Sequence, residues 1–310
     1  MGRDSLTGGS GLAIGAPAGA GAGTAARWRT VLGVFKLRIG VLIMITALGG
    51  LAIVPGGSAS ALQVIVLALS VLVASASAGA FNQFVEADSD RQMPRTRGRA
   101  FASRALPRSG GWLAAIGALL VLAVAAAAWY VNVLAAAFVL LGALTYAVVY
   151  TLMLKRRTAW NIVIGGLSGS FAVLAGAAAA GPAIGPLPLL LALVLFLWTP
   201  PHFWSLAIAN EAEYAAAGVP MLPVVVGTTR AAHIVHAHTI ALVAVSLLPF
   251  FFGAGWIYLV GALAGGAHFL HRTAALARAP GRRTAMASFF ASMAQLSVLL
   301  AAVAIDAALR

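Results

Sequence analysis

Cysteine is absent from this chain of 310 residues, and only seven residues are Asp or Glu. The lack of cysteine excludes disulfides, thiolate metal ligands and cysteine nucleophiles. Charged residues make up only 9% of the chain, against roughly 25% in soluble domains, which excludes an ordinary soluble domain. The chain is instead 62% hydrophobic, with a mean hydropathy of +0.98, and this excludes a disordered chain. These values predict a polytopic membrane protein.

Nine stretches are long and apolar enough to cross a bilayer, which takes roughly 20 apolar residues for a helix. They are residues 38–55, 62–84, 111–130, 132–154, 160–180, 187–209, 231–251, 254–271 and 284–307. An open sheet could not satisfy its backbone in lipid, so the predicted fold is all-α, with nine transmembrane helices. Residues 1–29, rich in Gly and Ala, are predicted to form a disordered tail, and residues 30–310 a single transmembrane domain.

The basic residues indicate the orientation of the predicted spans. The formal net charge is +13, and the 20 Lys and Arg residues fall in five clusters plus Arg310. These clusters occupy the N-terminal segment and the connections after spans two, four, six and eight, while the alternate connections hold none. The positive-inside rule therefore places the N-terminus and all five clusters in the cytoplasm. This distribution favours a membrane surface over nucleic acid as the reason for the positive charge.

Five of the seven acids form two groups, each at the cytoplasmic end of a predicted span. In the first group Asn82, Glu86 and Asp90 are spaced i, i+4 and i+8, which puts them on one helical face. Like charges at this spacing repel unless a cation lies between them, and Mg²⁺ is commonly shared between carboxylates and substrate phosphates. Arg95 and Arg99 follow directly and suit a phosphate or carboxylate ligand. The alternatives are a solvated charge patch at a helix end and an ordinary basic cytoplasmic loop.

The second group contains Glu211 and Glu213, shortly after a span that is interrupted by two consecutive prolines and His202. Prolines break the hydrogen-bond ladder of a helix, and such breaks are tolerated where the backbone lines a cavity. His202 is therefore a candidate substrate contact or ligand, although a lone histidine is more often a satisfied structural group. The histidines at 233, 236 and 238 do not share one face, so no metal cluster is predicted there.

Four strings of the sequence resemble a known family. They are NQFVEADSDRQMPRT at residues 82–96, KRRTAWNIVIGG at 155–166, LWTPPHFW at 197–204 and AGVPMLPVV at 217–225. The Asn-x3-Glu-x3-Asp spacing in the first resembles the first acidic motif of the UbiA-type intramembrane prenyltransferases. All four strings are similar to the protohaem IX farnesyltransferase (haem O synthase) branch of that superfamily. The nine-span plan extends the likeness from about residue 30 to the end.

The resemblance implies a nine-helix bundle around a central cavity, in the cell (inner) membrane, with its active site facing the cytoplasm. It implies transfer of a farnesyl group from farnesyl diphosphate to a vinyl group of haem B, with Mg²⁺ as cofactor. Asn82, Glu86, Asp90 and Glu213 would be the catalytic residues. The metal ligands would be Asn82, Glu86 and Asp90 for one ion and Glu213, with Glu211, for a second. Diphosphate or haem propionates would be bound by Lys36, Arg38, Arg95, Arg99, Lys155 and Arg156, with His202 and Tyr214 as further substrate contacts.

The expected partners are the two substrates, the lipid bilayer and a downstream haem-modifying enzyme or terminal oxidase assembly, with no nucleic acid.

The sequence departs from the family pattern in several places. Glu86 stands where the family usually has Asp, and Lys36-Leu37-Arg38 stands for the common Lys-Pro-Arg. In the second motif, residues 211–214 read Glu-Ala-Glu-Tyr where Lys-Asp-Asp-Tyr is usual, which removes a cation next to the second proposed metal.

Two other functions share parts of this pattern. A related UbiA-type enzyme that prenylates an aromatic or quinone precursor would share the first acidic motif, but the strings at 198–204 and 218–225 favour the haem branch. A cation-coupled transporter would also use broken helices, yet its site is expected near the bilayer midplane, not at one face. Prenyl transfer to haem B is therefore the favoured prediction.

Overall fold

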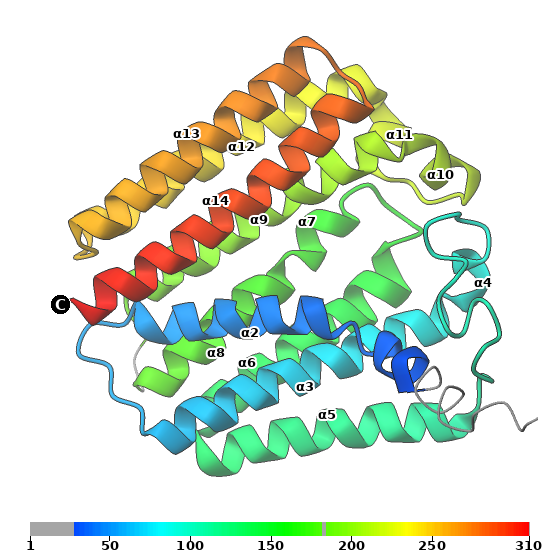
Figure 1. Cartoon of the computed structure of the whole chain (residues 1–310). Coiled ribbons are helices and arrows are strands. Elements are labelled where there is room, and N and C mark those ends of the chain that lie inside the picture. The colour runs from blue at the N-terminus through cyan, green and yellow to red at the C-terminus, as the bar shows by residue number, and fades with distance from the viewer. Residues whose placement is uncertain (1–27, 182–183, 310) are drawn as a thin grey trace, which may run out of the picture.

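The computed structural model describes residues 28–181 and 184–309, and within those residues it is helical with no strand (Figure 1). The predicted all-α class is confirmed, whereas residues 1–27 of the predicted tail lie outside the described residues. The long helices are α2 (Leu37–Ala52), α3 (Ala61–Val85), α5 (Gly110–Tyr130), α6 (Val133–Leu144), α8 (Leu167–Ala180), α9 (Pro186–Ala209), α12 (Thr228–Phe251), α13 (Trp256–Arg278) and α14 (Arg282–Ala308). The short ones are α4 (Ala87–Asp90), α7 (Asn161–Gly165), α10 (Glu211–Ala216), α11 (Leu222–Val226) and a π-helix, η1 (Thr145–Leu154).

Seven helical segments of the described chain are long and apolar enough to cross a membrane. They are α3, α5, α6 with η1, α7 with α8, α9, α12 and α14. An eighth span arises if the short helix Trp28–Val34 and α2, which meet at a bend of 45°, are counted together. The predicted span at 254–271 corresponds to α13, which has 23 residues but is not among the candidates. His268, His271 and Arg272 lie in the C-terminal half of this helix and interrupt its apolar stretch.

Small residues allow α2 and α8 to approach closely. A Cβ atom added to Gly176 would lie only 1.8 Å from the Ala47 carbonyl oxygen, and one added to Gly50 only 2.1 Å from the Val173 carbonyl oxygen. The two backbones are therefore in direct contact, as is common where membrane helices associate through glycine and alanine. This contact fixes α2, whose N-terminal end enters the polar site, against the centre of the bundle.

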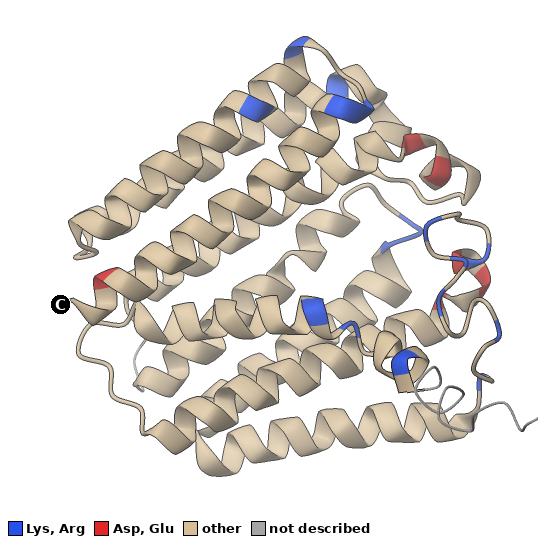
Figure 2. Ribbon diagram, in the orientation of Figure 1, with Lys and Arg blue, Asp and Glu red and all other residues tan. Residues whose placement is uncertain are grey.

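The two ends of the bundle differ in charge. Figure 2 shows the described Lys and Arg residues gathered towards the end that carries α4, α10 and α11. The opposite end holds Asp306, near the end of α14, whose Oδ2 accepts a hydrogen bond of 2.9 Å from the backbone N–H of Gly255. Gly255 is the N-cap of α13, so Asp306 supplies a cap from another helix to a donor that α13 itself leaves open. The basic connections thus share one end of the bundle, as the sequence predicts.

Candidate functional site

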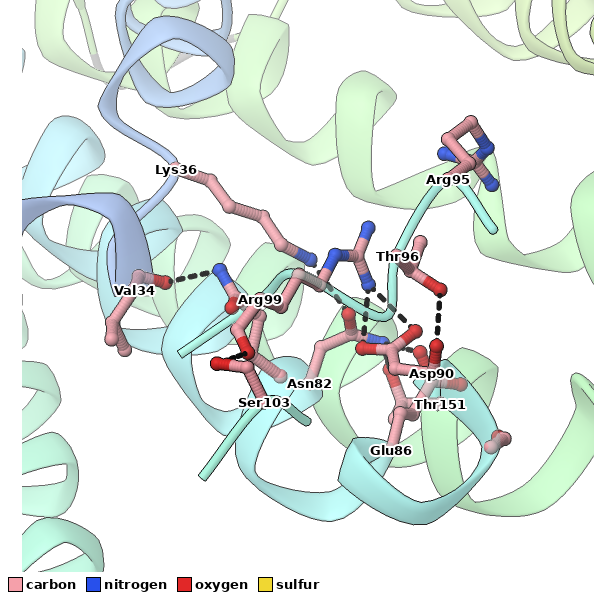
Figure 3. Close-up of polar contacts among 12 residues, drawn as sticks. Val34, Lys36, Asn82, Glu86, Asp90, Arg95, Thr96, Arg99, Ser103 and Thr151 are labelled. Carbon is pink, nitrogen blue, oxygen red and sulfur yellow. Dashed lines mark hydrogen bonds and ion pairs between the residues drawn. The ribbon is translucent and has the colours of Figure 1, made fainter. Parts of the chain in front are cut away.

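The first acidic motif lies where α3 passes into α4, at the charged end of the bundle (Figure 3). Glu86 joins the two helices, and the backbone bonds Glu86 N–H to Asn82 O (3.0 Å) and Asp90 N–H to Glu86 O (2.8 Å) continue the i to i+4 pattern across the junction. The side chains of Asn82, Glu86 and Asp90 therefore follow one another on one face. All three are buried, and Asn82 Nδ2 donates to Glu86 Oε2 at 2.8 Å.

Each buried carboxylate of the motif faces a cation, 69 residues away in the chain for Glu86 and nine residues away for Asp90. Lys155 Nζ lies 2.5 Å from Glu86 Oε1 and 2.6 Å from Oε2. Arg99 Nη1 donates to both oxygens of Asp90, at 3.0 and 2.8 Å. These contacts offset the repulsion that two acids at i and i+4 would otherwise cause. By contrast Asp88, the middle acid, is exposed and pairs with two arginines of the adjoining loop, Arg91 and Arg108.

Lys36 brings a third cation to the same place. Its Nζ donates to Asn82 Oδ1 at 2.6 Å and lies 3.5 Å from Tyr146 Oη. Lys36 sits at the bend between Trp28–Val34 and α2 and has a left-handed backbone conformation, with φ of 48° and ψ of 41°. A non-glycine residue adopts this conformation at a cost, and such strain is often found at functional sites. The bend directs the ammonium group towards the acidic motif.

The π-helix η1 supplies residues that the sequence did not single out. Thr151 Oγ1 accepts a hydrogen bond of 3.1 Å from Asn82 Nδ2 and donates to the Tyr146 carbonyl, five residues earlier, at 2.8 Å. The rings of Tyr146 and Tyr150 stack with centroids 5.6 Å apart. The wider helical turn places Thr151 and Lys155 on the acidic motif. The available signal was the presence of Thr151 and two tyrosines in an otherwise apolar span.

The other predicted anion-binding residues are distributed around this centre. Arg156 donates to Ser89 Oγ on α4, and Arg95 Nη2 lies 3.4 Å from Tyr214 Oη on α10. The Arg95 contact links the loop after the first motif to the second motif. Arg38 is exposed and makes no hydrogen bond or ion pair within the described part of the chain. The structure therefore groups Lys36, Arg99 and Lys155 closely and leaves Arg38 outside that group.

The two acids of the second group have different surroundings. Glu211 Oε2 accepts a hydrogen bond from Thr228 Oγ1, at the start of α12, so this carboxylate is already engaged. Glu213 Oε2 is buried and has no hydrogen-bond partner among the described residues. A buried, unpaired carboxylate oxygen is costly and rare in native structures. Glu213 is thus the residue of this pair that is open to a ligand.

The predicted contact His202 lies inside α9, one residue after the proline pair, and is 8% exposed. Its Nδ1 is 2.6 Å from Ser292 Oγ on α14, and its ring stacks on Trp198 and Phe289. On α12, His233 Nδ1 contacts the Thr229 carbonyl and His236 Nδ1 contacts Thr273 Oγ1, so these two histidines have separate partners.

The first motif fits a divalent cation by donor chemistry. Asn82, Glu86 and Asp90 offer only oxygen and amide donors, which suit a hard cation, and Glu213 Oε2 is an unpaired buried oxygen. In the structure the two carboxylates of the motif are paired with Lys155 and Arg99, and no group of three or more His, Asp or Glu residues in the described chain is arranged to hold a metal ion. Lys36, Arg99 and Lys155 around these acids form a site that can bind a polyphosphate with or without an accompanying cation.

The chain is similar to known proteins over most of its length. A model of the UbiA prenyltransferase family matches residues 43–297. A protoheme IX farnesyltransferase 2 of Paramagnetospirillum magneticum is 55% identical over 281 residues, which cover 91% of this chain and 98% of that protein. A protoheme IX farnesyltransferase of Marinobacter nauticus is 40% identical and covers 90% of this chain and 92% of its own length.

Solved structures share the fold at much lower identity. A structure described as digeranylgeranylglyceryl phosphate synthase has a TM-score of 0.75 and 19% identity, covering 91% of this chain and 99% of its own. A UbiA homologue from Archaeoglobus fulgidus bound to GPP and Mg²⁺ has a TM-score of 0.64 and 15% identity, covering 86% and 99%. At these identities the likeness concerns the arrangement of helices.

Proposed function

Since this chain belongs to the UbiA prenyltransferase family, we propose that it transfers the farnesyl group of farnesyl diphosphate to a vinyl group of haem B, giving haem O. The observation that carries the choice of substrates is the 55% identity, over nearly the whole chain, to a protoheme IX farnesyltransferase. The cluster of Lys36, Arg99 and Lys155 around the first acidic motif supports a diphosphate as the second substrate. The matched family and the relatives described above are prenyltransferases, which favours prenyl transfer over the alternative of a transporter.

In this proposal the chain is a multi-pass protein of the cell membrane with nine membrane helices. The ninth is α13, which lies between α12 and α14 in sequence and packs against both. The basic end of the bundle faces the cytoplasm, by the positive-inside rule, and the described N-terminal helix lies at that end. The charged site is then at the membrane surface, where a diphosphate can reach it without entering the hydrocarbon.

The cations of the site bind the diphosphate. Lys36 and Lys155 offer ammonium groups and Arg99 a guanidinium group, and together they neutralise the charge that grows on the leaving group. Arg95 and Arg156, which reach Tyr214 and Ser89, are exposed and can extend this anion site towards the solvent or the propionates of haem. To bind the diphosphate, Lys155 and Arg99 must contact its oxygens in addition to their present partners, the carboxylates of Glu86 and Asp90.

Mg²⁺ would be held by Asn82, Glu86 and Asp90, with Glu213 as ligand of a second ion. When bound, the metal supplies positive charge that stabilises the departing diphosphate. A UbiA homologue of the same fold was solved with GPP and Mg²⁺, which supports this assignment. Glu211 is a weaker candidate than the sequence implied, because its carboxylate already accepts a hydrogen bond from Thr228.

The apolar helices provide the environment in which the new bond forms. The C–O bond of farnesyl diphosphate breaks, and its electron pair leaves with the diphosphate. The π electrons of the haem vinyl group form the new C–C bond to the farnesyl carbon, and water adds to the neighbouring carbon and loses one proton. The allylic cation reacts rapidly with water, so an apolar environment is needed until the C–C bond has formed. The product would pass to a haem-modifying enzyme or to terminal oxidase assembly.

The experiment is product analysis by mass spectrometry. Purified protein in lipid is incubated with Mg²⁺, farnesyl diphosphate and either haem B or 4-hydroxybenzoate. The proposal expects haem O from the first mixture and no prenylated benzoate from the second. Prenylation of 4-hydroxybenzoate without haem O would assign the chain to the aromatic branch instead.

A further inference from the structure

His202 is held in one orientation by its neighbours. Its ring stacks on Trp198, with centroids 4.2 Å apart and planes at 19°, and on Phe289, with centroids 4.5 Å apart and planes at 27°. Trp198 is itself fixed, because its indole N–H donates to the Ser292 carbonyl at 2.9 Å. The imidazole is thus placed between two aromatic rings and cannot turn about its own axis without losing both contacts.

The hydrogen bonds of Ser292 determine the tautomer of this histidine. Ser292 Oγ donates its single proton to the Phe289 carbonyl at 2.6 Å. Since a hydroxyl group has only one proton to give, the contact of 2.6 Å between His202 Nδ1 and Ser292 Oγ needs the proton on Nδ1. The neutral ring then carries a lone pair on Nε2. A metal-binding histidine is typically prepared in this way, with one ring nitrogen held by a hydrogen-bond partner and the other free for the metal.

Nε2 of His202 is available to a ligand. It makes no hydrogen bond within the described residues, and it is not one of the fully buried unpaired polar atoms, which include His238 Nε2. His202 as a whole is 8% exposed, so most of the ring is covered, and Nε2 is an unpaired polar atom that the surrounding side chains do not completely enclose. An imidazole nitrogen without a hydrogen-bond partner is costly within an apolar span, and this cost indicates that Nε2 has a functional role.

We propose that His202 Nε2 coordinates the iron of the haem substrate, an inference that rests on the proposed function. Neutral imidazole is a common axial ligand of haem iron. His202 lies seven residues before the end of α9 at Ala209, so the iron would be held roughly 10 Å inside the charged end of the helix. The apolar porphyrin then lies within the membrane span, and its propionates can reach towards the basic end. His202 positions the acceptor, while the residues around Glu86 and Asp90 act on the diphosphate.

The test uses absorption spectra of the purified full-length protein with ferric haem B as the probe. The wild-type complex is expected to show the Soret band of a histidine-ligated haem. The His202→Ala variant is expected to lose that band position and to bind haem B at least about tenfold more weakly, and added imidazole should restore the spectrum. The KM for haem B should rise in this variant while the KM for farnesyl diphosphate stays unchanged. His238→Ala removes a histidine from the neighbouring helix α12 and should leave the spectrum as it is.

A second variant covers the case in which His202→Ala does not fold. His202→Met keeps an apolar side chain of similar length with a thioether that can bind iron, so its complex should show a different Soret position from the wild type. A wild-type spectrum in either folded variant would overturn the assignment of His202 while leaving haem O synthesis intact. Failure of the wild-type protein to bind haem B at all would overturn both the assignment and the proposed function.

Discussion

Lys155 and Glu86 are 69 residues apart in the chain, yet Lys155 Nζ lies 2.5 Å from Glu86 Oε1, and their side chains are only 18% and 4% exposed. The pair joins the end of the π-helix η1 to the junction between α3 and α4. Its burial makes the two charges dependent on one another, because either charge alone would lack a partner in a poorly hydrated place. The proposed diphosphate site is therefore also a point at which the bundle is held together.

We expect Lys155→Ala to lower the thermal unfolding midpoint of the protein, because it leaves Glu86 charged, buried and unpaired. Removing one partner of a buried ion pair lowers the free energy of unfolding by roughly 3–5 kcal/mol. The double variant with Glu86→Gln should recover part of that loss, since the neutral amide needs no counter-charge. The measurement is thermal denaturation in detergent, and equal midpoints for the single and double variants would contradict the coupling.

Asp90→Ala is expected to abolish turnover while the protein remains folded in the membrane. Asp90 is buried, belongs to the first acidic motif and is held by Arg99, so its loss removes charge from the proposed metal site. Haem O formation measured by mass spectrometry checks this outcome. Asp88→Ala is the matched control, because Asp88 is exposed and pairs only with loop arginines, and it should keep most activity. Normal haem O production by Asp90→Ala would refute the metal site.

Glu86→Asp is expected to be tolerated, because aspartate keeps the carboxylate and the negative charge at this position. The shorter side chain keeps the charge but withdraws the carboxylate from Lys155 by one methylene. We expect turnover within about tenfold of the wild type, a change of roughly 1.4 kcal/mol or less in the activation free energy. Initial rates with saturating substrates measure this. Complete loss of activity would mean that the site depends on the longer side chain and on its contact with Lys155.

Chelation of divalent cations should stop haem O formation, and Mg²⁺ should restore it. The two acids of α10 are expected to differ in this titration, because Glu213 Oε2 is unpaired whereas Glu211 is engaged by Thr228. Glu213→Gln should raise the Mg²⁺ concentration needed for half-maximal rate by about tenfold, the smallest effect expected for loss of a metal-site group. Glu211→Gln should change it far less. The reverse order would assign the second site to Glu211.

Gly176→Ala is expected to destabilise the bundle strongly, because its Cβ would collide with the Ala47 carbonyl oxygen at 1.8 Å and force α2 and α8 apart. Gly169 lies on the same helix with nothing within 4 Å of an added Cβ, so Gly169→Ala is the matched control. The control should be neutral or slightly stabilising, because alanine favours a helix by about 1 kcal/mol over glycine. Thermal midpoints in detergent compare the two variants.

The sequence predicted the helices well because the thickness of the bilayer fixes the length of each apolar stretch. The predicted span 62–84 differs from α3 by one residue at each end, and the predicted spans 111–130 and 187–209 differ from α5 and α9 by one residue at the N-terminal end. The π-helical form of η1 was not predicted, because it preserves the apolar composition of its span and changes only the hydrogen-bond pattern. The family, recognised from four strings of residues, was confirmed by the match over residues 43–297.

The sequence predicted which residues of the site share a helical face, but not which side chains contact one another across the fold. The spacing of Asn82, Glu86 and Asp90 was enough to place them on one face, because that depends on a single helix. The choice of Arg99 as the partner of Asp90, and of Thr228 as the partner of Glu211, depends on how separate segments pack. Composition and spacing carry no information on such contacts, so the roles of the predicted residues stay predictions until the variants are measured.

The contact between Asp306 and Gly255 has a consequence for biosynthesis. The two residues are 51 positions apart, and the ribosome delivers α13 to the membrane before it has made the carboxylate that caps its N-terminus. Until α14 follows, the first turn of α13 must leave this backbone donor without its carboxylate partner. The last two helices are therefore expected to enter the bilayer as a pair, so that a ribosome stalled between them would leave a nascent chain exposed to quality control.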